Sequence, residues 1–528
     1  MIAKPYALIS VTDKTGVVDF ASQLYSLGFN ILSTGGTAKV LTDAGVPVVK
    51  VSEFTDSPEI FDGRVKTLHP KIHGGILMDR ENTSHSSEAK ELGIQPIQLV
   101  VVNLYQFGKQ TQNQSLDLSK AIEYIDIGGP TMLRGAAKNY KNCTPVIDPT
   151  DYPVVIEQLR SSQGLHEDTK VSLAAKVFQT ISQYDHDIAA YFMKNTTQDR
   201  SDDSSSLPEE IPLNLHRKHT LRYGENPHQH AALYTTNEDV GGLPNAQILN
   251  GKALSYNNYL DLDAAINLVG DLSDYRTLAI IKHTNPCGVA AGTEGEPLAD
   301  IYKRALACDP KSAFGGIIAT NETIDLDTAT EIAKHFIECI AAPGISPEAL
   351  NLLSKKKNLR IVIVDSQRTH AAPNFDMRSI RGGLLLQQTD SLSAASPSNW
   401  TCPTKTKTSE GQNADLGFAW RICKHVKSNA IVYAKDLQTI AIGAGQVSRI
   451  DAAIYSAEKA LLDNKSLKDC VMASDAFFPF RDCVDIAAKH GISAIIQPGG
   501  SMRDDESIAA CDENAIAMAF TGNRHFRH

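Results

Sequence analysis

The chain has 528 residues, too many for one hydrophobic core, so roughly two to four domains are expected. Hydrophobic residues at 42% and charged residues at 21% describe an ordinary globular protein. A net charge of -10 argues against binding to a nucleic-acid backbone, and no apolar segment approaches a transmembrane helix. The nine cysteines, an odd number without a Cys-x-x-Cys pair, predict reduced thiols and a cytoplasmic location.

The first part of the chain alternates short apolar runs with helical patterns, which predicts parallel βαβ units and a doubly wound sheet. Strands are predicted at residues 7–11, 30–33, 46–51, 99–103 and 144–147, and helices at 17–27 and 38–44. The polar, serine-rich stretch at 198–210 is predicted to be a linker, because it has almost no apolar side chains to pack.

Three turns of this first part carry groups that suit an anion. Ser33-Thr34-Gly35-Gly36-Thr37 follows a strand and opens a helix, where paired glycines and a helix N-terminus favour a phosphate. Val11-Thr12-Asp13-Lys14-Thr15-Gly16 adds a lysine and hydroxyls, and Gly63-Arg64-Val65-Lys66-Thr67 adds two cations. Each turn alone is also common as a plain connection, but together they predict an anionic ligand.

A fourth block, Asp126-Ile127-Gly128-Gly129-Pro130, is predicted to open a helix, since proline suits the first helical position. Arg134 and Lys138 would then share one face of that helix. Asp126 at the helix start and Lys138 on its flank could transfer protons around a bound nucleotide. The alternative is an Arg/Lys stripe on the surface with no chemistry.

The C-terminal part, from 211 to 528, also mixes both element types. Strands are predicted at residues 278–281, 316–320, 360–364, 430–434, 440–444 and 494–497. A soft boundary is expected near 391–412, which is rich in Ser, Thr, Lys and Pro. Ser312-Ala313-Phe314-Gly315 and Ser474-Asp475-Ala476-Phe477 faintly echo each other, which weakly predicts a duplicated subdomain.

Lys282-His283-Thr284-Asn285-Pro286-Cys287-Gly288 follows the apolar run at 278–281. A lysine and a histidine therefore stand at a predicted strand end, where ligands of open α/β sheets collect, and Pro286-Cys287-Gly288 is predicted to turn the backbone away. Histidine titrates near neutrality and can serve as a base. By itself, such a pair more often decorates a surface.

Zinc chemistry is not predicted. Pro286-Cys287-Gly288 is half of a zinc-deaminase signature, but the second cysteine would fall at Ala290 and no His-x-Glu accompanies it. His69-Pro70-Lys71-Ile72-His73 lacks the glutamate of His-Glu-x-x-His, and Pro70 disfavours that helix.

Taken in order over the whole chain, these blocks resemble the bifunctional purine-biosynthesis enzymes that join an aminoimidazole-carboxamide ribonucleotide (AICAR) formyltransferase to an inosinate (IMP) cyclohydrolase. The most specific blocks are Lys282 to Gly288, Arg64 to Pro70, and Asp126 to Gly129. The resemblance implies a methylglyoxal-synthase-like doubly wound parallel sheet over 1–197 and two cytidine-deaminase-like α/β subdomains without zinc over 211–528. It also implies 10-formyltetrahydrofolate as co-substrate, no catalytic metal, and a homodimer.

The resemblance further implies site residues by motif match. Catalytic roles fall on His283, Lys282, Lys138, Asp126 and Lys66. Nucleotide-binding positions of the cyclohydrolase are Thr12, Asp13, Lys14, Thr34, Gly35, Gly36, Thr37, Arg64, Val65, Thr67, Asn103, Leu104 and Ile127. Those of the transformylase are Arg222, Tyr223, Gly315, Glu338, Asn429, Arg449, Phe477 and Arg524, and the folate would face Ile450, Asp482, Ser501 and Met502. Glu338 stands where some relatives have aspartate, and Cys483 where some have asparagine.

Two other functions remain compatible with the residues alone. A nucleotide-sensing regulatory protein would bind the same anions without turnover. A zinc-independent relative of the deaminases would share the fold of the C-terminal part.

Overall fold

The structure, a computed structural model, describes residues 4–528 except 62, 105–106, 108–117, 162, 197–206, 208–210, 212, 214, 236–241, 365–374 and 392–396. The chain divides into two compact units, Met1–Ser206 and Leu207–His528. Apart from Leu207, the predicted linker at 198–210 lies outside the described residues, as does part of the predicted boundary at 391–412. Within the described ranges, every helix is too short or too polar to cross a membrane.

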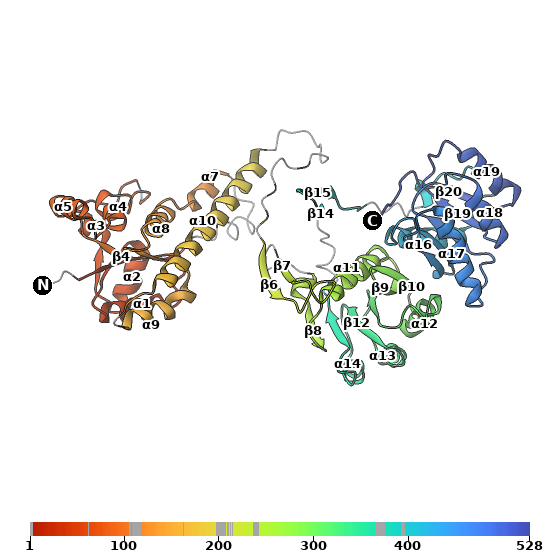
Figure 1. The fold of residues 1–528 in the computed structure, drawn as a ribbon, viewed down its shortest axis with the longest axis horizontal. Coiled ribbons are helices and arrows are strands. Elements are labelled where there is room, and N and C mark those ends of the chain that lie inside the picture. Colours follow the sequence, from red (N-terminus) through yellow and green to blue (C-terminus); the bar gives the residue numbers. More distant parts are fainter. Residues whose placement is uncertain are drawn as a thin grey trace. The chain divides into compact units, whose positions relative to one another are not determined.

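The first unit is built on a five-stranded sheet in the order β3-β2-β1-β4-β5, with all neighbours parallel. Figure 1 draws this unit in red to yellow, with strand β4 labelled. Its strands are β1 (Tyr6–Ser10), β2 (Asn30–Ser33), β3 (Val48–Lys50), β4 (Ile97–Val102) and β5 (Thr144–Val146). Its helices are α1 (Val17–Ser26), α2 (Gly35–Asp43), α3 (Val51–Thr55), α4 (Pro70–Leu77), α5 (Thr83–Glu91), α7 (Leu118–Ala121), α8 (Gly128–Lys138), α9 (Tyr152–Arg160) and α10 (Glu167–Thr196), with short 3₁₀ turns at Ile122–Tyr124 and Pro149–Asp151. The predicted parallel α/β sheet is confirmed.

Both faces of this sheet are covered, because successive side chains of a strand point to opposite faces. In β1, Ala7 and Ile9 join the core that α1 and α9 cover, whereas Leu8 joins the core beneath α4 and α8. Strands buried on both faces leave only their ends free for polar groups. The carboxyl ends of β1, β2 and β4 are therefore where a site can form.

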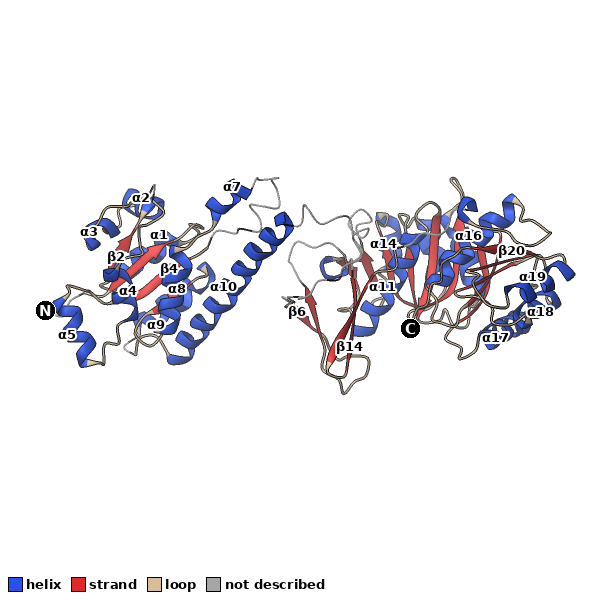
Figure 2. Cartoon of the chain, turned by 90° about the horizontal axis from the view of Figure 1, so that it is seen from above, coloured by secondary structure: helices blue, strands red, loops and turns tan. Residues whose placement is uncertain are grey.

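The second unit contains an eleven-stranded sheet in the order β20-β19-β18-β16-β17-β10-β9-β11-β12-β13-β8. Figure 2 draws its strands in red, with the edge strand β20 labelled. Its strands are β8 (Gln247–Asn250), β9 (Arg276–Lys282), β10 (Asn285–Gly292), β11 (Gly316–Thr320), β12 (Ile337–Ala342), β13 (Arg360–Ile363), β16 (Ile431–Lys435), β17 (Gln438–Gly443), β18 (Val471–Ser474), β19 (Ala494–Gln497) and β20 (Ala517–Phe520). Two hairpins stand apart from it: β6 (His216–Thr220) with β7 (Ala232–Thr235), and β14 (Phe375–Ile380) with β15 (Gly383–Gln388).

The helices of the second unit are α11 (Tyr256–Asp271), α12 (Leu298–Cys308), α13 (Leu326–Ala333), α14 (Pro347–Leu353), α16 (Glu410–Lys424), α17 (Arg449–Leu462), α18 (Asp482–Lys489) and α19 (Asp504–Glu513), with 3₁₀ turns at Leu243–Asn245 and Pro397–Asn399. One face of the sheet packs against α11 and α16, in a single core. The other face has two cores, one under α12 to α14 and one under α17 to α19.

The two halves of this unit repeat one order of elements, a helix, an antiparallel hairpin, and three further strands separated by helices: α11 to β13, then α16 to β20. The Ser-Ala-Phe-Gly echo does not follow this repeat. Its first copy precedes β11, whereas its second copy begins at the last residue of the equivalent strand β18. The expected duplication is present in the topology, but its sequence signal was a coincidence.

Two local predictions are wrong. Pro286-Cys287-Gly288 does not turn the backbone away, because these residues lie inside β10; the turn is His283-Thr284, between paired Lys282 and Asn285. Pro70 does not prevent a helix after His69, since proline at the first position suits a helix start and the His69 side chain caps α4.

Two candidate active sites

The first unit has a cavity of about 820 Å³ at the carboxyl ends of β1, β2 and β4. The predicted residues that line it are Thr12, Lys14, Thr34, Gly35, Gly36, Thr37, Arg64, Lys66, Thr67, Asn103, Asp126 and Ile127. These residues come from five separate stretches of sequence. The fold therefore brings the anion-binding turns and the Asp126 block to one place.

One end of the cavity is suited to a phosphate. Helix α2 begins at Gly35, and Thr34 precedes it without a side-chain cap hydrogen bond, so the first N–H groups of the helix remain available. The Lys14 ammonium donates to Thr37 Oγ1 at 3.0 Å and to the carbonyl of Val11. Burial lowers the pKa of Lys14. A bound anion would compensate this partly desolvated charge.

The other cations of the cavity are held by carboxylates. Lys66 Nζ lies 3.1 Å from Glu59 Oε2, and the Arg64 guanidinium pairs with Glu123 in an ion pair largely open to solvent. Exposed pairs of this kind are weak, so an incoming dianion can compete for both cations.

Asp126 stands at the start of α8, where its carboxylate accepts the N–H of Gly129 at 3.0 Å. Its own N–H donates to the Tyr184 hydroxyl of α10 at 2.7 Å, which fixes the backbone at this point. Burial raises the pKa of Asp126, against the opposing effect of the Gly129 and Gly128 N–H groups. A carboxyl group whose proton is held more firmly than usual is suited to proton transfer near neutrality.

Four predicted residues do not line this cavity: Asp13, Val65, Leu104 and Lys138. Asp13 has a supporting role, because Asn103 Oδ1 accepts its N–H at 3.0 Å while Asn103 Nδ2 donates to its carbonyl at 3.0 Å. Lys138 is exposed at the last position of α8, about 15 Å along the helix axis from Gly128. The arrangement of this chain therefore gives no support to the proton-transfer role predicted for Lys138.

The second unit has a cavity of about 500 Å³ beside the β9–β10 hairpin, lined by Lys282, His283, Asn285, Asp309, Gln446 and Lys459 among others. His283 and Thr284 form the two-residue turn with φ of 54° and 62°, values that a threonine rarely adopts. His283 is exposed rather than packed in the core. The turn holds the imidazole out at the mouth of the cavity.

Asp261, on α11, supports this strained turn from below. Its carboxylate accepts the N–H of Thr284 at 2.6 Å and interacts with the N–H and the imidazole of His283. Burial raises the pKa of Asp261, and the nearby Glu338 adds to this effect. Lys282 is fixed separately, because its ammonium donates to the carbonyl of Phe314 at 2.8 Å, beside the predicted Gly315.

Hydrogen bonds link the hairpin to the predicted positions of the second half. Asn285 Oδ1 accepts the N–H of Lys427 at 3.0 Å, in the loop that contains Asn429. Arg449 donates to Asn429 Oδ1 at 2.7 Å and forms an ion pair with Asp475, which is fully buried. Arg449 is thus already paired within the chain, and it orients Asn429.

The remaining predicted transformylase residues lie outside this cavity. Arg222 stacks on Tyr223 with its guanidinium 5.4 Å from the ring centre, and Arg524 stacks on Phe526 at 4.6 Å. Glu338 accepts from Asn258 Nδ2 at 3.2 Å. Ile450, Asp482, Ser501 and Met502 lie near the N-termini of α17, α18 and α19, and Met502 is fully exposed. Phe477 is partly exposed.

Sequence reasoning missed Asp261, Asn285 and Asp475 as residues that support the two sites. Asp261 carries no local signal, since it is one acid on an amphipathic helix. Asn285 and Asp475 do lie within motifs described above, but the sequence did not show which residues they would contact.

In the part of the chain that the structure describes, side chains of the types that ligate metals do not gather in one place. Among the described residues, no group of three or more His, Cys, Asp or Glu side chains could hold a metal ion. All nine cysteines are free, and all but Cys402 are buried.

Comparison with known proteins identifies the family. Residues 136–459 match the family described as the AICARFT/IMPCHase bienzyme, and residues 16–131 match the MGS-like domain. Two relatives called bifunctional purine biosynthesis protein PurH, from Acidithiobacillus ferrooxidans and Bacillus cereus, are each 47% identical; the alignments cover 99% of this chain and 99% and 100% of the relatives. The chain belongs to the AICARFT/IMPCHase bienzyme family.

Membership of the bienzyme family confirms the resemblance predicted from the sequence, and the MGS-like match confirms the expected type of N-terminal domain. The comparison with cytidine deaminases stays a prediction. A solved structure, the crystal structure of ForH, is 37% identical and covers 36% of this chain and 96% of its own, with a TM-score of 0.32.

Proposed function

We propose that the two cavities are the two active sites of a bifunctional enzyme of purine biosynthesis. The enzyme transfers a formyl group from 10-formyltetrahydrofolate to AICAR, then closes the formylated product to IMP with loss of water. Family membership supports this pair of activities. The separation of the proposed reacting groups into two cavities, one in each unit, supports the assignment of one reaction to each.

Formyl transfer is assigned to the cavity at the β9–β10 hairpin. The amine of AICAR is a poor nucleophile because its lone pair is delocalised into the imidazole and carboxamide. His283 accepts the amine proton as the nitrogen attacks the formyl carbon. Lys282 stabilises the oxyanion that forms or protonates the departing folate nitrogen. The exposed position of His283 beside the cavity supports this role.

The nucleotide and the folate are assigned to loops of the second half, one of which is connected to this hairpin. Asn285 accepts from Lys427, and Arg449 donates to Asn429 two residues further along the same loop, which supports a continuous binding surface. The folate is assigned to Ile450, Asp482, Ser501 and Met502 by motif match. Arg524, Arg222 and Tyr223 are assigned to the nucleotide on the same ground.

Ring closure is assigned to the cavity of the first unit. Both reacting groups belong to one molecule, so much of the catalysis is positioning. The phosphate lies at the N-terminus of α2 beside Lys14, and Asp126 transfers protons at the ring being closed. Lys66 is the catalytic cation supported by the cavity lining.

Three further properties belong to this proposal. The enzyme works as a homodimer, needs no metal for catalysis, and resides in the cytoplasm. The nine free cysteines are compatible with a reducing compartment.

Reciprocal loss of activity tests the two-site assignment. His283→Ala is expected to abolish formyl transfer and leave cyclohydrolase turnover intact, whereas Lys66→Ala is expected to do the reverse. Both reactions are measured on purified full-length protein, each with its own substrate. A folded His283→Ala variant that has lost both activities would contradict separate sites. Lys138→Ala is measured beside Lys66→Ala. Loss of cyclohydrolase turnover in Lys138→Ala would support the catalytic role that the family's motif predicts for Lys138. Loss in Lys66→Ala alone would support the lysine that lines the cavity.

A further inference from the structure

The two halves of the second unit can be compared residue by residue through their strand registers. Thr320 of β11 pairs with Leu278 of β9, and Ser474 of β18 pairs with Ile431 of β16. The residues that follow each strand therefore correspond, so that Asn321 in the first half is equivalent to Asp475 in the second. By the same count, Arg276 is equivalent to Asn429.

The next strands extend the match. Ala341 of β12 pairs with Ala319, and Ile496 of β19 pairs with Ala473. Counting onward, Pro343-Gly344 of the first half is equivalent to Pro498-Gly499 of the second. This edge of the second half carries the loops with Asn429, Phe477, Ser501 and Arg524, to which the substrates are assigned. The equivalent edge of the first half has no assigned role.

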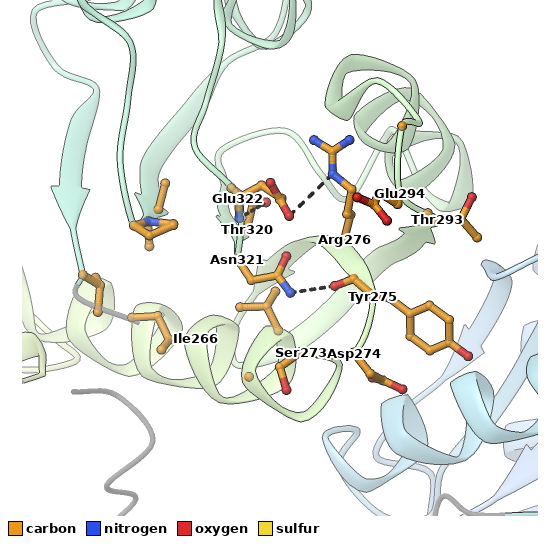
Figure 3. A pocket seen from close by; sticks show the side chains of 18 residues that line it. Ile266, Ser273, Asp274, Tyr275, Arg276, Thr293, Glu294, Thr320, Asn321 and Glu322 are labelled. Atoms are coloured by element: carbon orange, nitrogen blue, oxygen red, sulfur yellow. Dashed lines mark hydrogen bonds and ion pairs between the residues drawn. The ribbon is translucent and has the colours of Figure 1, made fainter. Parts of the chain in front are cut away.

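That edge of the first half holds a cavity of about 770 Å³, a volume typical of small-molecule sites. It lies at the carboxyl ends of β10 to β13 and beside the end of α11, away from the His283 turn, which joins the opposite end of β9 to β10. Figure 3 shows Arg276, Glu294, Asn321 and Glu322 around it. By position, the cavity is the internal counterpart of the proposed substrate loops.

The lining of this cavity selects against phosphate. Its one guanidinium, Arg276, already donates to the carbonyl of Glu296 at 2.5 Å and lies 3.5 Å from Glu322 Oε1. Asp274, Glu294 and Glu322 bring three carboxylates to the lining. Asp274 is paired with Arg421, and Glu294 is exposed. Acceptors therefore outnumber free donors, and a phosphate would meet net negative charge.

The opposite wall is apolar. It is formed by Ile266 and Val269 of α11, by Ala341 within β12 and Pro343 just after it, and by Val364 beyond β13. An apolar wall facing carboxylates suits a flat ring that carries exocyclic amines, because the ring stacks on the wall while the amines donate to Glu294 and Glu322.

We propose that this cavity is a second ligand site, for a heterocyclic base or nucleoside with exocyclic amines and without a phosphate. The proposal rests on the proposed function, because the equivalent loops of the second half acquire their role from it. It also makes the two halves complementary, one for the phosphorylated substrate and one for its uncharged relative.

The test is a calorimetric titration of the full-length protein with 5-aminoimidazole-4-carboxamide riboside, in the presence of saturating AICAR. The nucleotide occupies its own site, so binding of the riboside reports the second site. Wild type is expected to bind one riboside per chain. Thr293→Trp, which fills the rim of the cavity, is expected to abolish binding. Glu322→Gln keeps an acceptor but removes the carboxylate charge, and is expected to weaken binding by roughly 10-fold, because a hydrogen bond to a charged group is about twice as strong as a neutral one.

Thr330→Trp is the matched control, because Thr330 is exposed on α13 and does not line the cavity; it should bind the riboside as wild type does. Formyl transfer in all three variants verifies that they are folded. Absence of riboside binding in wild type, or equal binding in wild type, Thr293→Trp and Glu322→Gln, would overturn the inference. If wild type lacks formyl transfer, the proposed function fails instead; normal turnover without a second binding event refutes only the second site.

Discussion

Replacing Asp261 by alanine tests what holds the His283-Thr284 turn in place. The carboxylate accepts the N–H of Thr284 at 2.6 Å, under two consecutive residues with positive φ. A hydrogen bond to a charged group contributes about 1.5–3 kcal/mol, and each residue held in such a backbone conformation costs about 1–3 kcal/mol. Without the carboxylate, the strained turn is expected to populate other conformations in which His283 is misplaced.

The expected result is a fall in the kcat/KM of formyl transfer by about 10- to 150-fold, the range that 1.5–3 kcal/mol corresponds to. Cyclohydrolase activity should not change, because its cavity lies in the other unit. Asp261→Asn keeps an acceptor and should lose less. Asp263→Ala, two residues along the same helix and exposed, is the matched control. The reasoning is refuted if Asp261→Ala retains formyl transfer within about 2-fold of wild type.

Three further outcomes are expected. Burial raises the pKa of Asp126, so its carboxylate destabilises the fold as pH rises through the raised pKa, whereas below its ordinary pKa of about 3.9 the group is protonated in both states. Asp126→Asn should therefore have a higher Tm than wild type at pH 8 but not at pH 3.5, and no cyclohydrolase turnover; an unchanged Tm at pH 8 would contradict the burial. A Cβ at Gly36 would meet no atom within 4 Å and would point into open space, so Gly36→Ala should fold with unchanged or slightly higher Tm. Its KM for the cyclohydrolase substrate should rise by about 10-fold, unless no phosphate binds at α2. Of the nine cysteines only Cys402 is partly exposed, and burial raises the pKa of Cys287 to about 12, so one thiol per native chain should react rapidly with an aromatic disulfide reagent; several fast thiols would refute this.

Local patterns in the sequence determined most of the first unit. Apolar runs and the turn residues between them specified the strands of the parallel sheet. They also predicted helices beginning near Ala38 and Pro130, within three residues of the observed starts at Gly35 and Gly128. Because such sheets place their carboxyl ends along one edge, the anion-binding turns could be expected to meet. Of the twelve predicted residues in the first cavity, those after β1, β2 and β4 follow from that rule. Those of the Arg64 to Thr67 and Asp126 to Ile127 stretches do not follow a strand directly, so packing brought them there.

The tertiary structure alone decided how the second unit is built. Whether His283 lies in a hairpin turn depends on the pairing of β9 with β10, and the support from Asp261 depends on how α11 packs beneath it. The link from Asn285 to Lys427 joins residues far apart in the chain. Such contacts are set by register and packing between distant segments, which no periodicity within a single segment encodes. The sequence by itself predicted the candidate reacting groups, and the packing of distant elements determined which of them share a cavity and which, like Lys138, stand outside it.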